Sequence, residues 1–438
     1  MVKILRGERL LTHISPIGPL PARATVELIL RIQGLMRVSV YKDKYPTSFV
    51  VPRDSGHHID RRLFLPFDRF IDSLDGVALL APFHNADLVH AFNRVPIGEK
   101  KYVISFESHL PRRFRFESNN AYTKWMTDEI AGSHCRRIIA LSHYARREFL
   151  AQIKDTRAAK KLEAKLFVRH PNAELGADVD PLAEQLSQGR MDEMVITFVG
   201  AHFARKGGCV ATLLAKKALD ENLPLRVQIV SSLKVGKTVW TDPTSEAFFK
   251  PYLDLLNLPN VTHYESLPND EVRQMLGRSH FGFLPTFADT FGYSIIEAMA
   301  EHTPSIGTPV QAIPEFLQHD FNGLMLPLDV DVIGNWVRPH YNSRSEPFYE
   351  KFVANEIERL ADHALTAIRP YLDTPAKMLP LRRNARLTAE KMFSPTVSRD
   401  FYDPFYDRIA TEDTSTLPEL SPLDVSSPTI SDLAKQLA

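Results

Sequence analysis

Cysteine is scarce in this sequence: Cys135 and Cys209 are the only two in 438 residues, and they do not form a CxxC pair. A disulfide framework and a cysteine-rich zinc site are therefore excluded, and free thiols fit a reducing compartment. No run approaches the ~18 apolar residues of a membrane-spanning helix. The first residues lack the longer apolar core of a secretory signal. We therefore expect a cytoplasmic protein.

An excess of charge of either sign is also missing, because 53 Lys and Arg balance 53 Asp and Glu. A general nucleic-acid-binding protein would carry a basic excess, so that class is disfavoured. The hydrophobic share of 44% and the charged share of 24% are ordinary globular values, which exclude a fully disordered or collagen-like chain. At ~150 residues per domain, the length suggests two or three domains.

Short apolar, β-branched runs alternate with helix-like stretches, and these runs predict strands buried on both faces. Such alternation favours parallel sheets built from βαβ units, and hence an α/β fold. The predicted strands lie within residues 47–52, 76–82, 87–92, 102–108, 136–142, 194–200, 225–232, 261–267, 280–286 and 323–329.

The polar segment 178–193, with Pro181 and Gly189, is interpreted as a linker between two α/β domains. The last residues are rich in Ser, Thr and Pro, and such a segment buries too little apolar surface to order itself. The sequence therefore predicts a first domain, a second domain, a final helix and a flexible tail, over residues 1–185, 186–395, 396–411 and 412–438 in that order.

The most informative stretch is 281–300, FGFLPTFADTFGYSIIEAMA, which predicts a strand, a short loop and a helix. Gly292 allows close backbone approach to a ligand and leaves the first helical N–H groups open, an arrangement that suits a phosphate. Asp289 and Glu297 are carboxylates that can accept hydrogen bonds from sugar hydroxyls at the carboxyl edge of the sheet. Alternatively, Ser294 and Glu297 form a capping box and Asp289 is an ordinary loop residue.

A second strand–loop–helix junction is predicted over 194–208, MVITFVGAHFARKGG. Gly200 ends the strand, and Arg205 and Lys206 supply two cations before a pair of glycines opens the helix, as a diphosphate requires. The stretch has neither Walker nor GxGxxG spacing, and its alternative interpretation is a solvated basic loop. In a parallel sheet both junctions open onto one edge, and their combination suits a nucleotide diphosphate joined to a sugar.

These residues resemble the retaining nucleotide-sugar glycosyltransferases of the GT-B fold, glycosyltransferase family 4. The family signature of an acidic residue, seven residues and a Glu is matched by Asp289 and Glu297, with Asp in place of the usual first Glu. FVGAHFARKGG resembles the family's VGR…KG loop, with Ala201 where the family has Arg, and 303–329 resembles the segment that follows the signature. The resemblance covers roughly 194–330, while the first half matches more loosely.

The resemblance implies two Rossmann-like domains facing across a cleft: an acceptor domain, a donor domain and a final helix that crosses back to the first. It implies transfer of a sugar, with retention and without a metal, from a nucleotide-diphosphate sugar to a saccharide, lipid-linked or small-molecule acceptor. No cofactor is expected besides that donor substrate. Two alternatives stay open: a nucleotide-sugar 2-epimerase-like isomerase on the same fold, and a non-catalytic nucleotide-sugar-binding protein.

The resemblance also assigns roles to individual residues. Glu297 would hold the ribose hydroxyls, Asp289 would contact the donor sugar, and Lys206 with Arg205 would stabilise the leaving diphosphate. His109 matches the family's cleft histidine, and His202 is a weaker candidate. The implied catalytic residues are His109, Lys206 and Asp289. The implied donor-binding residues are Gly200, Arg205, Lys206, Asp289, Thr290, Phe291, Gly292, Tyr293 and Glu297.

Weaker signals point to a metal or a membrane. Asp178 with Asp180, and Asp329 with Asp331, resemble the DxD of metal-dependent glycosyltransferases, but such triplets arise by chance and no metal is expected. The basic segments 112–116 and 154–165 suggest peripheral contact with an anionic membrane or a lipid-phosphate acceptor. A solvated charged face is the alternative interpretation of both segments.

Overall fold

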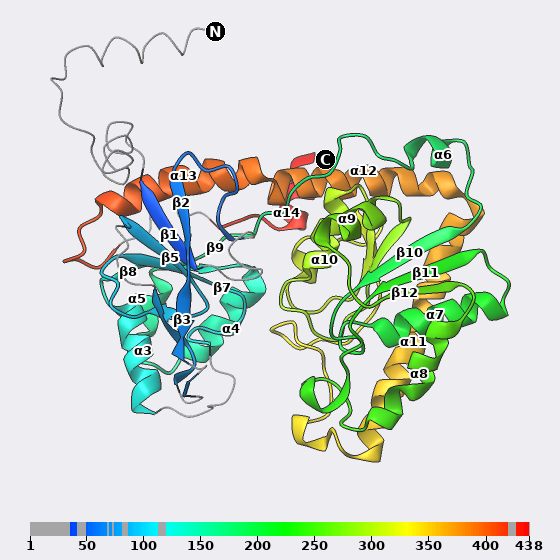
Figure 1. The fold of residues 1–438 in the computed structure, drawn as a ribbon, viewed down its shortest axis with the longest axis horizontal. Helices are drawn as coiled ribbons and strands as arrows, with labels where there is room; N and C mark the ends of the chain where they lie inside the picture. Colours follow the sequence, from blue (N-terminus) through cyan, green and yellow to red (C-terminus); the bar gives the residue numbers. More distant parts are fainter. Residues whose placement is uncertain are drawn as a thin grey trace, which may run out of the picture.

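A computed structural model describes residues 36–41, 50–67, 70–71, 74–80, 86–112, 120–418 and 426–437. In this part of the chain, two six-stranded parallel sheets organise the two halves, and they stand side by side (Figure 1). The predicted α/β architecture of two Rossmann-like domains is confirmed.

The first sheet has the order β2-β1-β5-β7-β8-β9. Its central strands are buried along their whole length, as strands covered on both faces must be, although His90, Ser105, Arg136 and Arg137 interrupt their apolar runs. The bounds are β1 Arg37–Tyr41, β2 His58–Arg62, β5 Leu88–Phe92, β7 Tyr102–Phe106, β8 Cys135–Ala140 and β9 Leu166–Val168, with helices α3 Ala121–Ala131, α4 His143–Ile153 and α5 Ala159–Glu163.

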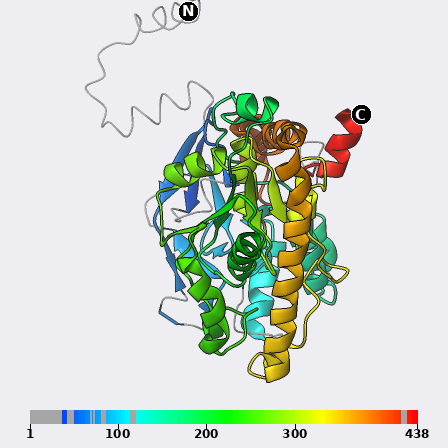
Figure 2. The same cartoon turned by 90° about the vertical axis from the view of Figure 1, so that its right-hand side faces the viewer.

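The second sheet has the order β12-β11-β10-β13-β14-β15, the doubly wound arrangement in which strand order reverses between β10 and β13. Its helices α7 and α11 lie side by side (Figure 2). The strands are β10 Met194–Val199, β11 Leu225–Val230, β12 Val261–Tyr264, β13 Phe281–Leu284, β14 Ser305–Gly307 and β15 Gly323–Met325. The helices are α6 Ala183–Ser187, α7 Gly208–Asp220, α8 Lys250–Asp254, α9 Asn269–Gly277, α10 Tyr293–Ala300 and α11 Pro347–Asp373.

Several strands differ from the sequence prediction. The run 76–82 contributes β4, Val77–Leu80, to a small separate sheet with β3, Phe64–Pro66, and β6, Val95–Pro96. There β4 pairs antiparallel with β3, and Leu79 is 40% exposed rather than buried on both faces. The run 47–52 lies partly outside the described residues, and Val51 and Pro52 are in no strand. Strands β1, β2, β9 and β14, and β3 and β6 of the small sheet, were not predicted.

Two C-terminal helices connect the domains. Helix α12, Met378–Thr388, lies along the second domain, and α13, Pro395–Thr411, continues onto the first (Figure 1). Tyr402 and Phe405 of α13 join a buried cluster with Val38 of β1 and Leu88 of β5. Helix α13 thus adds apolar surface to the core of the first domain.

The segment 412–438, predicted as a flexible tail, is packed where the structure describes its later part. Ser427 donates its N–H to the carbonyl of Val168 over 2.8 Å, and helix α14, Ile430–Leu437, follows. Ile430 and Leu433 are buried in the core of the second domain. The composition of the tail did not indicate helix α14, because two apolar residues at helical spacing are enough to give a short helix one buried face.

Candidate active site

A cleft of about 600 Å³ lies where strand order reverses in the second sheet. This is the point at which open α/β sheets bind ligands, outside the carboxyl ends of the strands. Both junctions predicted from the sequence contribute to it. The residues that line the cleft include Phe92, Glu107, Gly200, His202, Arg205, Lys206, Ser231, Ser232, Asn269, Tyr293, Ser294 and Glu297.

The two junction loops are bonded to each other. The carbonyl of Arg205 accepts the N–H of Phe287 over 2.9 Å and the hydroxyl of Thr286 over 3.0 Å. In return, the Arg205 guanidinium donates to the carbonyl of Ala288. Gly207 has φ 95° and a Cβ there would lie 2.4 Å from the Pro285 carbonyl oxygen, so only glycine allows this approach. The loops therefore form one rigid unit.

Lys206 and Asp289 meet at the centre of this unit. The Lys206 Nζ lies 2.8 Å from the Asp289 Oδ2. The lysine stem crosses Gly200, where a Cβ would lie 2.6 Å from the Lys206 Cδ. Burial opposes ionisation of Asp289, but Lys206, Arg205 and the N–H of Gly292 outweigh burial and lower the pKa of this carboxyl. A fixed ion pair thus lies at the edge of the cleft.

The first turn of α10 differs from the expected open anion site. Gly292, at φ 83°, donates its N–H to Asp289 Oδ1 over 3.0 Å, so this donor is already engaged. The ring of Phe291 is 1% exposed and stacks on Phe316 at 5.2 Å, so its side chain belongs to the core. Only the backbone of Phe291 can serve a ligand, whereas Tyr293 lines the cleft.

Glu297 also lines the cleft, on the first turns of α10. Its Oε1 accepts a hydrogen bond from Asn269 Nδ2 over 3.0 Å. Burial raises the pKa of Glu297 above its ordinary value, despite that hydrogen bond and the charge of Lys206. The N-cap of α10 is Gly292 and no side chain caps it, so the capping-box alternative for Ser294 and Glu297 is wrong.

The histidine candidates lie in different cavities. His202 lines the 600 Å³ cleft, where burial, followed by repulsion from Arg205, Lys206 and Lys234, lowers its pKa to about 4. His109 lines a second cavity of about 750 Å³, which also contains Ala288 and Thr290. The loop that carries Asp289 therefore lines the cavity of His109, and it reaches the cleft only through the pairing of Asp289 with Lys206.

Sequence reasoning missed several polar residues of the cleft. Glu107 directly follows β7, Ser231 and Ser232 directly follow β11, and Asn269 begins α9. The first three were open to prediction, because polar residues that end buried parallel strands collect at the carboxyl edge of a sheet. Asn269 gave no such signal, because its role depends on its contact with Glu297.

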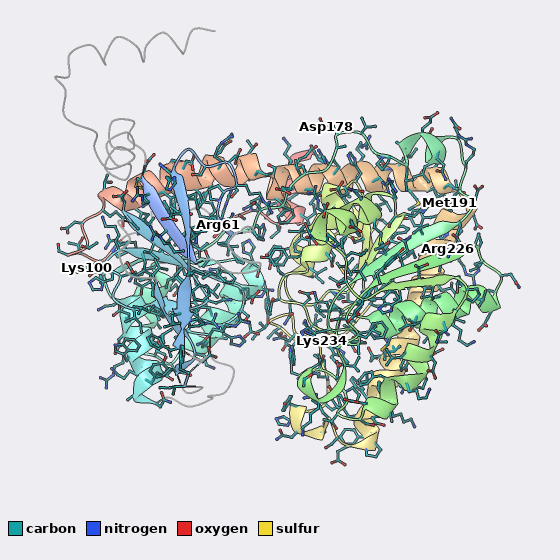
Figure 3. The ribbon with its side chains drawn as sticks, viewed as in Figure 1. Arg61, Lys100, Asp178, Met191, Arg226 and Lys234 are labelled. Carbon is teal, nitrogen blue, oxygen red and sulfur yellow. The ribbon has the colours of Figure 1, made fainter. Side chains whose placement is uncertain are left out.

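The DxD-like triplets serve structure in this protein. Asp180 pairs with Arg382 at 2.7 Å, and Asp178, which lies beside α12 (Figure 3), pairs with Arg386 at 3.0 Å. Asp331 accepts the backbone N–H groups of the turn that follows it.

In the part of the chain that the structure describes, one group of side chains has its potential metal-ligand atoms within 4.8 Å of one another: His143, His170 and Glu315. Its carboxylate already accepts hydrogen bonds from His170 and from the backbone N–H groups of His143 and Tyr144.

The proposed membrane segments are tested only in part. Of 112–116, all but Arg112 lies outside the described residues. In 154–165, Lys165 is 1% exposed and donates to the carbonyls of Ile130 and Gly132, so its charge faces the interior. Among the described residues, none of the helices is both long and apolar enough to cross a membrane.

Comparison with known proteins agrees with this geometry. Residues 193–335 match the family model described as glycosyl transferases group 1. No curated protein sequence matches the chain.

Solved structures share the fold at low identity. A glycosyltransferase from Rickettsia africae ESF-5 is 16% identical, with a TM-score of 0.51, over 75% of this chain and 78% of that one. Sucrose-phosphate synthase from Thermosynechococcus elongatus is 14% identical, with a TM-score of 0.51, over 89% and 94%. Anabaena Alr3699/HepE, solved in complex with UDP, is 11% identical, with a TM-score of 0.50, over 85% and 100%. The chain thus shares the GT-B fold of these glycosyltransferase structures, and its residues 193–335 match the glycosyl transferases group 1 family.

Proposed function

We propose that the protein transfers a sugar, with retention of anomeric configuration and without a metal, from a nucleotide-diphosphate sugar to an acceptor hydroxyl. The observation that carries the proposal is the Lys206–Asp289 pair, held at 2.8 Å between two loops at the reversal point of the second sheet. The donor would occupy the 600 Å³ cleft, with Glu297 accepting hydrogen bonds from the ribose. The UDP complex of Anabaena HepE supports a nucleotide in this fold.

The reaction needs stabilisation of a leaving diphosphate. As the bond between the anomeric carbon and the diphosphate oxygen breaks, its electron pair passes to the diphosphate. Lys206 and Arg205 are cations positioned beside that charge, which stabilise it without reorganisation. The acceptor oxygen bonds to the same face of the sugar, and its proton passes to a diphosphate oxygen. No protein nucleophile is required, and Asp289 orients Lys206 and contacts the donor sugar.

Donor binding and turnover test this proposal directly. UDP-, GDP- and ADP-sugars are titrated by thermal shift, and transfer or hydrolysis is followed by NMR, which also reports the anomer. We expect one nucleotide class to raise the melting temperature, the product to retain its configuration, and a chelator to leave the rate unchanged. If no nucleotide sugar binds better than buffer salts, the proposal fails. Metal-rescued loss of activity would contradict metal independence.

Substitutions at the ion pair form a second test. Lys206→Met should lower kcat/KM by about 100-fold or more, because the loss of one preorganised donor costs ~3 kcal/mol of transition-state stabilisation. It also leaves the Asp289 carboxylate buried and unpaired, so stability should fall. Lys206→Met combined with Asp289→Asn should recover stability but not activity. Lys217→Met, which removes a lysine paired with Glu358 on the surface of α7, is the control and should keep full activity.

A further inference from the structure

The 750 Å³ cavity beside the Asp289 loop carries two exposed aromatic rings. Trp240 is 46% exposed and Tyr341 is 51% exposed, and both line the cavity. Large aromatic side chains on a surface usually mark a binding site when they are held in place. We call Trp240 and Tyr341 the aromatic platform.

A buried arginine holds the platform in place. Arg344 is 4% exposed and donates to the carbonyls of Gly236 and Val239, over 3.2 and 2.6 Å, and to that of Asp242. Its guanidinium also lies 4.9 Å from the ring centre of Tyr341. The loop that presents Trp240 and the loop that presents Tyr341 are thus fixed to one side chain. The two rings are preorganised, which lowers the entropic cost of binding.

The wall behind the platform is also aromatic and rigid. Trp336, 7% exposed, lies between Phe287 and Phe352, with ring centres at 4.5 and 5.6 Å. Phe287, Ala288 and Thr290 of this cavity belong to the same loop as Asp289, so the cavity lies next to the proposed reaction centre. A ligand on the platform would therefore extend toward the donor sugar.

The polar wall of the cavity contains a hydrogen-bond acceptor atom that has no partner among the described residues. Gln311 is 5% exposed and donates its Nε2 to the hydroxyl of Tyr144 over 3.0 Å and to Asn335 Oδ1 over 3.2 Å. Its Oε1 has no hydrogen-bond partner among the described residues, although it is buried. A buried acceptor without a partner is costly, and a ligand hydroxyl would satisfy it.

We propose that this cavity binds the acceptor and that the acceptor is a saccharide, an inference that rests on the proposed function. Apolar C–H faces of sugar rings match Trp240 and Tyr341, and a sugar hydroxyl matches Gln311 Oε1. A polyprenyl chain would use the aromatic rings but leave Gln311 Oε1 without a hydrogen-bond partner. The volume lies within the range of about 300–1,000 Å³ typical of small-molecule sites.

Tryptophan fluorescence can report on this cavity alone. The chain has three tryptophans, and Trp125 stacks on Tyr122 of α3, outside the cavity. A Trp125→Phe background leaves only Trp240 and Trp336, which both line the cavity. The protein is first screened, without donor, on an array of neutral and acidic oligosaccharides, and bound ones are then titrated by fluorescence. We expect at least one oligosaccharide class to bind and change the emission.

Two platform variants and a control make the test decisive. Trp240→Ala and Tyr341→Ala should each weaken oligosaccharide binding by about tenfold, which corresponds to ~1.4 kcal/mol, because each removes a ring that packs on a sugar face. The thermal shift by the donor nucleotide should not change. Phe348→Ala removes an exposed ring outside the cavity. This control should change neither the oligosaccharide affinity nor the thermal shift by the nucleotide.

The inference is overturned if no oligosaccharide on the array binds, or if both platform variants bind as tightly as the parent. A polyprenyl phosphate that binds in place of every oligosaccharide would overturn it as well. If no nucleotide sugar raises the melting temperature of the parent protein, the proposed function is refuted instead. Because the oligosaccharide measurement uses no donor, the two failures are distinguishable.

Discussion

Glu297 is held at the wall of the cleft in an environment that disfavours its charge. Burial raises its folded-state pKa above the ordinary value, so the unfolded chain ionises more readily than the folded one. Stability contributed by the protonated carboxyl is present below the unfolded pKa and is lost as pH rises through the folded pKa. At neutral pH, the buried carboxylate therefore lowers stability.

Glu297→Gln should separate these two effects. The amide keeps the size of the side chain but does not ionise, so the variant should melt at a higher temperature than the parent near pH 8 and at the same temperature near pH 4. Affinity for the donor nucleotide should fall by about 10–100-fold, because a hydrogen bond to a charged group contributes ~1.5–3 kcal/mol. Melting curves across pH and nucleotide titrations measure both. A melting-temperature difference that does not change with pH would refute the pKa argument.

At the residue scale, the sequence predicted the site residues that lie next to a recognisable strand or helix. Asp289, Glu297 and Lys206 were identifiable because each follows or opens an element whose period is visible in the sequence. The platform residues Trp240 and Tyr341 were not, because the Arg344 that fixes them bonds to Asp242, 102 positions away. Nothing in the local composition indicates that contact.

Helix α14 illustrates a packed element in a segment of low apolar content. Ile430 and Leu433 are 3% and 6% exposed, and Ser427 accepts a hydrogen bond from His143 Nε2 over 2.9 Å. Burying two such aliphatic side chains contributes about 3–6 kcal/mol, as an upper estimate. Ile430→Ser and Leu433→Ser together should therefore lower the urea midpoint clearly. Lys435→Ala, on the exposed face, is the control, and equal midpoints for all three proteins would show that α14 is not docked.

At the element scale, prediction succeeded for the longest strands and for several short ones, and failed for other strands of two to five residues. The six-residue strands β10 and β11 were visible as mainly apolar, β-branched runs, although Thr197, Arg226 and Gln228 interrupt them. Strand β14, Ser305–Gly307, has three residues and a serine and a glycine at its ends, so it carries almost no periodic signal. Its position comes from pairing with β13 and β15, a tertiary effect that propensity does not contain.

The arrangement of the whole molecule depends on a carboxylate between the two domains. Glu315 of the second domain is 6% exposed. It accepts the backbone N–H groups of His143 and Tyr144, at 2.8 and 2.7 Å, where α4 begins in the first domain. Negative charge at a helix N-terminus is favourable, and burial strengthens that effect. Burial lowers the pKa of nearby His170, despite Glu315, so this histidine is neutral at pH 7 and hydrogen-bonds to the carboxylate at 3.1 Å.

Glu315→Gln should therefore weaken the contact between the domains. The amide has one acceptor oxygen where the carboxylate has two, and its NH₂ group would face a backbone donor, at a cost of about 3 kcal/mol. We expect calorimetry to show unfolding at a lower temperature or in two separate transitions. We also expect faster proteolysis in the connecting segment 171–193. Glu271→Gln, at an exposed carboxylate of α9, is the matched control and should leave both unchanged.

Acidification should weaken the same contact in the parent protein. A histidine with a lowered folded pKa costs stability as pH falls below its ordinary pKa, since the unfolded chain then binds the extra proton. The melting temperature of the parent should consequently fall between about pH 7 and pH 5, and His170→Gln should reduce that slope. If Glu315→Gln unfolds and is cleaved like the parent, the domains are held together by α13 and α14 instead.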